Sequence, residues 1–260
     1  MVSWIAYDQK TSLTWLIQRG DKADPVIAVD QQGRVVHSFG RGLYTIPHAI
    51  RLDPEGNVWT VDAGSSTVIK FSPKGEKLLQ INVGGQPKTA GSAFRGTTDI
   101  AFASKGRIFI SDGYANARVL EYTADGRKVR EWGSAGTGPG QFHLPHSIVA
   151  DENNILYVAD RENGRIEKFN LDFKFLGEIS NLGRTYSLKL GTHGTLWASM
   201  QPFNEPPGDP GWIVKLDRNT GKILGYVRVT ETPGLHCVEV DKDGQPMTDV
   251  GNGVVWFRNQ

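Results

Sequence analysis

The feature that most constrains the fold is a short segment that recurs along the chain. Residues 46–53, 144–151 and 235–241 each contain a histidine, then a short apolar run, then an aspartate five residues after the histidine. The three histidines are His48, His146 and His236. Self-similarity of this kind indicates a repeat architecture, which takes precedence over local propensity.

Three weaker copies complete the series, with Ser3, Asp99 and Tyr186 at the position of the histidine. These six anchor residues divide the chain into units of about 40 to 50 residues, each with the pattern of four short strands. We therefore predict an all-β, six-bladed β-propeller in which residues 1–260 form one domain. The fifth unit is the least regular, and a proline-rich segment at 201–211 interrupts it.

The sixth unit has three predicted strands, at 237–241, 245–248 and 253–258. A fourth strand is either absent, supplied by an N-terminal segment, or cut off. Because most propellers protect their sheet edges by closing the ring, we expect this junction to be the weak point.

The composition excludes several classes of partner. The formal net charge is +1 and no run of Lys and Arg occurs, so we expect no nucleic acid partner. No apolar stretch is long enough to span a membrane, and no signal peptide opens the sequence. The compartment stays open: secreted or periplasmic if a signal has been removed, otherwise cytoplasmic. Cys237 is the single cysteine, which excludes an internal disulfide, and we expect a monomer.

The three anchor histidines predict a metal site. They fall in units two, four and six, and alternate blades of a six-fold ring lie about 120° apart, so three equivalent imidazoles can converge on the axis. Three histidines with room for a further ligand are typical of a catalytic Zn²⁺ site. The remaining histidines do not share the repeat frame, and we interpret them as structural or surface groups; they are His37, His143 and His193.

Loops between the second and third strands of a unit add three candidate catalytic residues: Arg19, Tyr114 and Arg161. Tyr114 and Arg161 lie equally far along the chain from their anchors, so we expect them at similar heights. A phenol beside a divalent cation and two arginines should have a lowered pKa, which suits a general base. Two arginines in one cleft favour a substrate carboxylate. Arg118 and Arg165 are expected to tie the blades together.

At this point the chain resembles a known family. The segments 113–119 and 163–166 are typical of NHL-repeat propellers. Within them, the sequence resembles the peptidyl-α-hydroxyglycine α-amidating lyases over nearly its whole length. The motifs that carry this resemblance are at 47–50, 111–114, 140–147 and 158–166.

The resemblance implies a function and a set of ligands. It implies a lyase that splits a carbinolamide C–N bond to give an amide and glyoxylate, acting on a peptide or smaller substrate with a carboxylate. It implies Zn²⁺ on the three anchor histidines, Tyr114 as base, and Arg19 and Arg161 near the substrate. It also implies a structural Ca²⁺ held by the backbone carbonyls of Ile5 and Ile50 and by one aspartate.

The chain departs from the family at several positions. Cys237 stands where the family has its calcium-binding aspartate, although Ca²⁺ prefers oxygen ligands. Gly234 replaces a methionine, and the disulfides of the family are missing. Two other functions stay open. One is a metal-dependent hydrolase of a lactone or ester, favoured if Arg19 and Arg161 prove dispensable. The other is a non-catalytic NHL binding module, which would hold no tightly bound metal.

Overall fold

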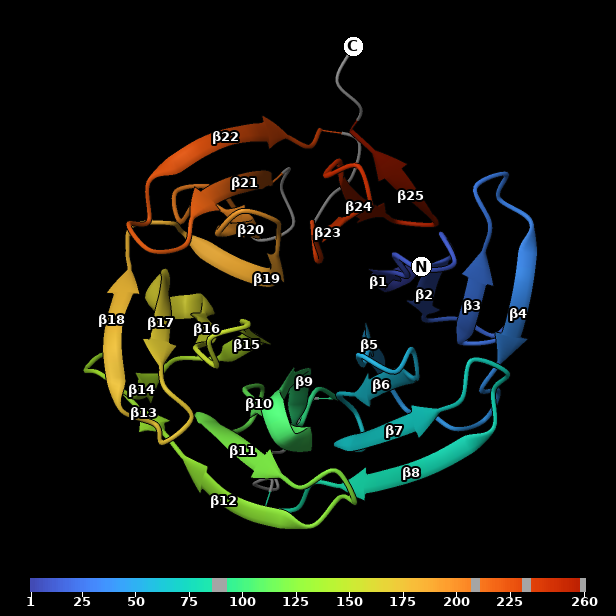
Figure 1. Cartoon of the computed structure of the whole chain (residues 1–260), viewed down its shortest axis with the longest axis horizontal. Coiled ribbons are helices and arrows are strands. Elements are labelled where there is room, and N and C mark those ends of the chain that lie inside the picture. The colour runs from blue at the N-terminus through green and yellow to red at the C-terminus, as the bar shows by residue number, and fades with distance from the viewer. Residues whose placement is uncertain (86–92, 207–210, 231–234, 258–260) are drawn as a thin grey trace.

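The computed structural model describes residues 1–85, 93–206, 211–230 and 235–257. Over these residues the strands form six small antiparallel sheets around a common axis, which is the predicted all-β six-bladed propeller (Figure 1). Five of the sheets have four strands and the sixth has three. The helical elements of the described ranges are two 3-10 turns, η1 (Ser104–Gly106) and η2 (Arg161–Asn163). None of the helices in these ranges has the length and hydropathy needed to cross a membrane.

The chain passes through the blades in order, and within each blade the first strand lies nearest the axis (Figure 1). The first two blades contain β1 (Val2–Tyr7), β2 (Thr14–Gln18), β3 (Val26–Val29), β4 (Val35–Phe39), β5 (Pro47–Leu52), β6 (Val58–Asp62), β7 (Thr67–Phe71) and β8 (Lys77–Asn82). The third and fourth contain β9 (Thr97–Ala103), β10 (Arg107–Asp112), β11 (Arg118–Tyr122), β12 (Lys128–Trp132), β15 (Pro145–Ala150), β16 (Leu156–Asp160), β17 (Arg165–Phe169) and β18 (Phe175–Ile179).

The fifth blade contains β19 (Arg184–Leu190), β20 (Thr195–Gln201), β21 (Trp212–Asp217) and β22 (Ile223–Arg228), and the sixth contains β23 (Glu239–Val240), β24 (Pro246–Val250) and β25 (Gly253–Trp256). A short parallel pair, β13 (Ser134–Ala135) and β14 (Gln141–Phe142), joins the third blade to the fourth. The fifth blade is thus as regular as the others, and the expected irregularity is confined to the connection after β20. Three strands are found in the sixth blade, as predicted, and Arg258 lies outside the described residues.

Burial follows the position of a strand in its blade. The inner strand β5 and its neighbour β6 are almost wholly buried, whereas the outermost strand β8 alternates and is mostly exposed. Inner strands are covered on both faces by neighbouring blades, so even their polar side chains, such as His48 and Arg51, are buried. Outer strands have one solvated face. The inner ends of the blades therefore provide a rigid, water-excluding frame around the axis.

The first strand of each of the first five blades carries a β-bulge at the anchor residue. In the second blade Pro47 pairs with Asp62 and Ala49 with Val61, which leaves His48 unpaired between them. The same shift leaves Ser3, Thr98, His146 and Tyr186 unpaired in the first, third, fourth and fifth blades. Bulges of this kind re-aim a side chain and are common beside functional sites. They also correct one prediction: the anchor of the third blade is Thr98, and Asp99 follows it.

Candidate metal centre

The structure brings the three anchor histidines together on the propeller axis. His48 and His146 are fully buried, and one possible ligand atom from each of the three imidazoles lies within 4.8 Å of the others. Among the described residues, these three histidines are the cluster of His, Cys, Asp or Glu side chains that could hold a metal ion. The rings are arranged edge to face, with centroids 4.8 to 5.0 Å apart.

Each histidine is oriented by a backbone carbonyl of the next blade around the ring. His48 Nδ1 lies 2.6 Å from Thr98 O, His146 Nδ1 lies 2.6 Å from Tyr186 O, and His236 Nδ1 lies 2.7 Å from Ser3 O. A carbonyl only accepts, so each Nδ1 must carry the proton and donate it. The acceptor residues are themselves the bulged anchors of the odd-numbered blades. This arrangement leaves the Nε2 lone pairs available to a metal, as in most metal-binding histidines.

The electrostatics keep the imidazoles neutral. Burial lowers the pKa of His48 and His146 well below the usual value for histidine, and lowers the pKa of His236 to about 3. The nearby guanidinium group of Arg161 lowers the pKa of all three histidines further, and that of Arg19 does so for His48 and His236. A neutral imidazole is the form that binds a metal. Three neutral nitrogen donors with an open position fit Zn²⁺, so the residues present suit the ion that the sequence predicts.

Tyr114 lies at the mouth of this cluster. Its hydroxyl oxygen is 2.9 Å from His48 Nε2 and 3.0 Å from His146 Nε2. Burial raises the pKa of Tyr114 to about 12, and this outweighs the lowering effect of Arg161 and Arg19. The protein groups alone therefore do not produce the lowered phenol pKa predicted from the sequence. A cation on the histidines would have to supply that effect, because nearby positive charge favours the phenolate.

The two predicted arginines reach the same region but differ in their partners. Arg19 donates from Nε to Pro47 O at 2.9 Å and from NH2 to Ser3 Oγ at 2.9 Å, and its guanidinium lies over the Phe94 ring. No carboxylate forms an ion pair with Arg19 among the described residues. Its positive charge is therefore not neutralised by an acidic partner in this part of the structure.

Arg161, in contrast, is paired. It belongs to η2, and its Nε lies 2.8 Å from Glu162 Oε1. Glu162 also contacts Arg184 at 3.3 Å, and the Arg161 guanidinium lies over the Tyr186 ring at 5.0 Å. The ion pair with Glu162 and the contact with the Tyr186 ring hold Arg161 in one orientation beside Tyr114. Of the two arginines, Arg19 is thus the better candidate to bind a substrate carboxylate.

Two residues of the site were missed by the sequence reasoning. Trp4 is fully buried, and its indole contacts the rings of all three anchor histidines at centroid distances of 5.4 to 6.4 Å. Ser3 donates from Oγ to His48 O at 2.9 Å and accepts from Arg19. The sequence held a signal for Trp4: it is a large aromatic residue at a repeat position where the second and fourth units have the small residues Ala49 and Ser147.

The residues beside the expected calcium carbonyls do not fit that ion. Ile5 and Ile50 are fully buried on the inner strands β1 and β5. Burial raises the pKa of the Cys237 thiol well above its usual value, so it stays protonated and is a poor ligand for a hard cation. The guanidinium of Arg51 lies in this layer and already carries a positive charge. Gly234, the other departure from the family, lies outside the described residues.

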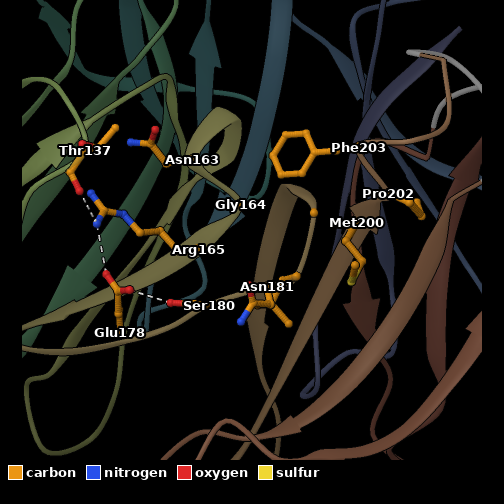
Figure 2. Close-up of a pocket in the computed structure, with 12 residues that line it drawn as sticks. Thr137, Asn163, Gly164, Arg165, Glu178, Ser180, Asn181, Met200, Pro202 and Phe203 are labelled. Carbon is orange, nitrogen blue, oxygen red and sulfur yellow. Dashed lines mark hydrogen bonds and ion pairs between the residues drawn. The ribbon is translucent and has the colours of Figure 1, made fainter.

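Arg118 and Arg165 have the structural role expected of them. Arg165 donates to the backbone oxygens of Thr137, Gly138 and Gln141 and pairs with Asp160 and Glu178. Figure 2 shows Arg165, Glu178 and Ser180 along the wall of a cavity of about 550 Å³ between the fourth and fifth blades. No anchor histidine lines this cavity. The cavity is therefore separate from the metal centre. Its charged groups Arg165 and Glu178 pair with each other.

Comparisons with known proteins agree with the motifs. A family described as "6-bladed beta-propeller" matches residues 93–205. A probable peptidyl-alpha-hydroxyglycine alpha-amidating lyase of Caenorhabditis elegans is 34% identical over 84% of this chain and 65% of its own length. NHL repeat-containing protein 3 of Homo sapiens is 30% identical over 68% of this chain and 54% of its own length. The expected resemblance is confirmed: the chain is homologous to proteins of these names.

The chain spans only part of other relatives. Peptidyl-glycine alpha-amidating monooxygenase of Mus musculus is 32% identical over 69% of this chain, which corresponds to 22% of the length of that protein. Among solved structures, one titled "Streptogramin B lyase structure" superposes with a TM-score of 0.69, at 18% identity, over 97% of this chain and 91% of its own. At that identity the similarity establishes the fold alone.

Proposed function

We propose that the protein is a zinc-dependent lyase that cleaves the C–N bond of a carbinolamide of the peptidyl-α-hydroxyglycine type. The observation that supports this most directly is the placement of Tyr114 over three neutral histidines, with the guanidinium of Arg19, which forms no ion pair with a described carboxylate, beside them. The names of the homologues favour the same reaction class.

The reaction moves one proton, in total, from the substrate oxygen to the leaving nitrogen, and it needs no oxidant. The hydroxyl of the substrate loses its proton, the carbinol carbon forms a C=O bond, and the C–N bond breaks with its electron pair going to nitrogen. That nitrogen gains a proton, so the products are an amide and glyoxylate. His48, His146 and His236 would hold Zn²⁺, which when bound supplies a Lewis acid that stabilises negative charge on oxygen.

The remaining residues bind the substrate and move its proton. Tyr114 accepts the hydroxyl proton, and its phenol oxygen lies beside the would-be metal ligands, 2.9 Å from His48 Nε2 and 3.0 Å from His146 Nε2. Arg19 binds the carboxylate in a bidentate manner. A cavity of about 340 Å³ extends from Arg19 and Pro47 between the first two blades and offers room for the rest of the substrate.

The first experiment measures metal content together with product. Purified wild type should contain about one zinc per chain and release glyoxylate from α-hydroxyhippurate. His146→Ala should lose both the zinc and the activity, whereas His143→Ala, at an exposed histidine outside the repeat frame, should retain them. Absence of zinc from the wild type after zinc is added would contradict the proposal and leave the propeller as a binding scaffold.

A matched pair of arginine variants tests the substrate carboxylate. Arg19→Lys should lower kcat/KM by about 10- to 100-fold, because lysine cannot form the bidentate contact. Arg161→Lys should lose less, since Glu162 already pairs with Arg161. The control substrate is the methyl ester of α-hydroxyhippurate, on which wild type and Arg19→Lys should be equally slow. A full rate for Arg19→Lys on the free acid would show that Arg19 does not bind the substrate carboxylate.

A further inference from the structure

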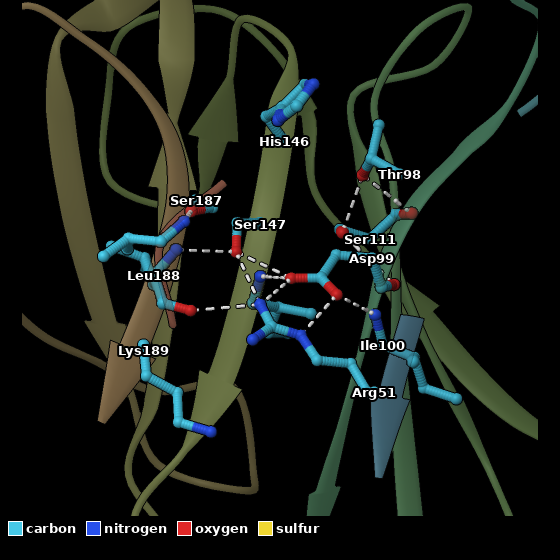
Figure 3. A network of polar contacts seen from close by, with 12 residues as sticks. Arg51, Thr98, Asp99, Ile100, Ser111, His146, Ser147, Ser187, Leu188 and Lys189 are labelled. Atoms are coloured by element: carbon cyan, nitrogen blue, oxygen red, sulfur yellow. Dashed lines mark hydrogen bonds and ion pairs between the residues drawn. The ribbon is translucent and has the colours of Figure 1, made fainter. Parts of the chain in front are cut away.

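An arginine and an aspartate meet on the propeller axis below the three histidines, as Figure 3 shows with His146 for reference. Arg51 projects from β5 and Asp99 from β9, and both are buried. Arg51 Nε lies 3.0 Å from Asp99 Oδ1, and Arg51 NH2 lies 2.6 Å from Asp99 Oδ2. This is a bidentate ion pair, the strongest geometry available to these two side chains.

The same guanidinium reaches three further blades. Its NH2 group donates to Leu188 O at 3.0 Å and contacts Ser147 Oγ at 3.3 Å, and its carbon lies 5.1 Å from the Trp4 ring centroid. Inner strands β1, β5, β9, β15 and β19 therefore all contact one side chain. Burial alone would lower the pKa of Arg51, but Asp99 raises it above its ordinary value, so the group stays charged.

Asp99 is just as fully engaged. Besides Arg51, it accepts hydrogen bonds from Ser147 Oγ at 2.6 Å, from Ile100 N at 2.8 Å and from Ile148 N at 3.2 Å. Both of its oxygens have at least two partners. The carboxylate is therefore held in place without any ligand from solution.

Of the residues that directly follow the six anchors, Asp99 is the one that carries a carboxylate. It directly follows the bulged anchor Thr98, and the residues that follow the other anchors are Trp4, Ala49, Ser147, Ser187 and Cys237. Two neighbouring acids are only partly engaged: Glu239 Oε1 lies 2.6 Å from Lys189 Nζ while its Oε2 is buried without a hydrogen bond, and Asp249 Oδ1 accepts from Cys237 N at 2.9 Å. A calcium ion needs six to eight oxygen ligands, usually with carboxylates among them. Within the described residues this layer does not leave such a set free.

We propose that the Arg51 guanidinium is a built-in cation that takes the place of a structural calcium ion on the axis. It binds the axial carboxylate and joins five blades, so the fold does not depend on Ca²⁺. A cation carried by a side chain is always present in the folded protein. A buried charge is costly unless it is paired and hydrogen-bonded, and here Asp99, Ser147 and Leu188 meet that requirement.

Arg51 also separates the two ends of the axis. A cavity of about 240 Å³ is lined by Arg51, Leu52, Phe102 and Lys189, and by none of the anchor histidines. Trp4 contacts Arg51 and also the three histidine rings. These two side chains lie between the far cavity and the metal centre, so we expect substrate to approach the histidines from the side of Tyr114 and Arg19.

The test is the response of the zinc-loaded protein to calcium. We expect wild type, purified into metal-free buffer, to contain no stoichiometric calcium by elemental analysis. Millimolar CaCl₂ should leave its Tm unchanged relative to the same concentration of MgCl₂. One calcium ion per chain, or a Tm rise of several degrees with calcium alone, would overturn the proposal. The outcome is independent of the lyase assay, because neither measurement uses substrate.

A double-mutant cycle tests the pair itself. Arg51→Met should lower the Tm by about 10 °C, because it leaves a buried carboxylate without its cation. The double variant with Asp99→Asn should lose less than the two single variants together. If Arg51→Met does not fold, Arg51→Lys replaces it and should show a smaller loss. Additive losses would show that the two side chains do not act as a pair. Arg127→Met, at an exposed ion pair with Asp125 within one blade, is the control and should lose less than Arg51→Met.

Discussion

At the scale of single residues, the chemistry of the histidines is decided by their backbone neighbours. Each imidazole donates from Nδ1 to the carbonyl of the next anchor around the ring, from His48 to Thr98, for example. That contact fixes the tautomer and aims Nε2 at the axis. The contact uses only the backbone carbonyl, so serine, threonine and tyrosine can each provide it.

Removal of the Tyr114 hydroxyl should separate catalysis from metal binding. We expect Tyr114→Phe to lower kcat by roughly 10²- to 10⁴-fold, because a general base contributes that much to a rate. Zinc content should stay near the wild-type value, since the three imidazoles remain. Elemental analysis and glyoxylate release measure the two properties. Loss of zinc together with activity would show that Tyr114 acts by holding the metal centre in shape.

Glu167 should make stability depend on pH. Burial raises its pKa to about 7, above the value near 4.5 expected in the unfolded chain. The folded state therefore binds the proton more tightly, and the stabilisation is lost as the pH rises through 7. Glu167→Gln should be more stable than wild type at pH 8 by about 1 to 2 kcal/mol, after allowance for partial screening by solvent, and similar at pH 4.

Urea unfolding of both proteins at several pH values measures this difference. Glu131→Gln is the control of opposite sign, because Lys128 and other partners lower the pKa of Glu131. That variant should be less stable than wild type at pH 8. A Glu167→Gln protein that is destabilised across the whole range would show that the carboxylate is ionised and bound by Arg165 in the native state.

At the scale of elements, aspartates at the ends of the second strands support the loops that carry the site. Asp160 ends β16, accepts from His143 N at 2.6 Å and pairs with Arg165 at 2.9 Å. Asp112 ends β10 and binds Asn116 and Arg118 in the same way. The loop between these partners contains Tyr114 in one blade and Arg161 in the next. The strand end thus fixes the height of the catalytic loop.

Loss of one such aspartate should destabilise the whole domain. Asp160→Ala leaves the buried guanidinium of Arg165 without its main partner, which typically costs about 3 to 5 kcal/mol. Urea unfolding should show this loss. Asp125→Ala, at an exposed ion pair with Arg127, is the matched control and should leave the Tm unchanged. Equal effects of the two substitutions would show that the loop is held by its backbone alone.

At the scale of the whole molecule, the ring closes through side-by-side contacts between the first and sixth blades. Val2 N donates to Gly251 O, His236 Nδ1 to Ser3 O, and Gln9 Nε2 to Val240 O. Within the described residues no strand is shared between the two blades, and β25 is the outermost strand of its sheet. A strand at a sheet edge has unpaired backbone groups on one side.

Hydrogen exchange should therefore be faster in β25 than in the third strands of the other blades, which have a neighbour on both sides. We expect amides of 253–257 to exchange at least about 10-fold faster than those of 67–71 in β7, the third strand of the second blade. That strand lies between β6 and β8 and is protected on both sides. Mass spectrometry of peptides from the zinc-loaded protein measures both segments. Equal protection would show that another segment covers β25 in solution.

The fold was predictable from the sequence because a propeller repeats one local pattern. Strand alternation, turn residues and the six anchors are short-range features, and they place the three strands of the sixth blade within two residues of their observed bounds. The convergence of His48, His146 and His236 followed from symmetry once the six units were recognised. The one-residue error at Asp99 arose because a β-bulge shifts the frame of a strand without leaving a mark in composition.

What only the tertiary structure decided depends on contacts between blades that are far apart in the sequence. The pairing of Arg51 with Asp99, the raised pKa of Tyr114 and the different partners of Arg19 and Arg161 are all of this kind. The burial and the electrostatic environment of a side chain on the axis depend on residues from several blades. A local sequence pattern does not contain this information. The sequence therefore determined which residues reach the axis, and the closed ring determined their chemistry there.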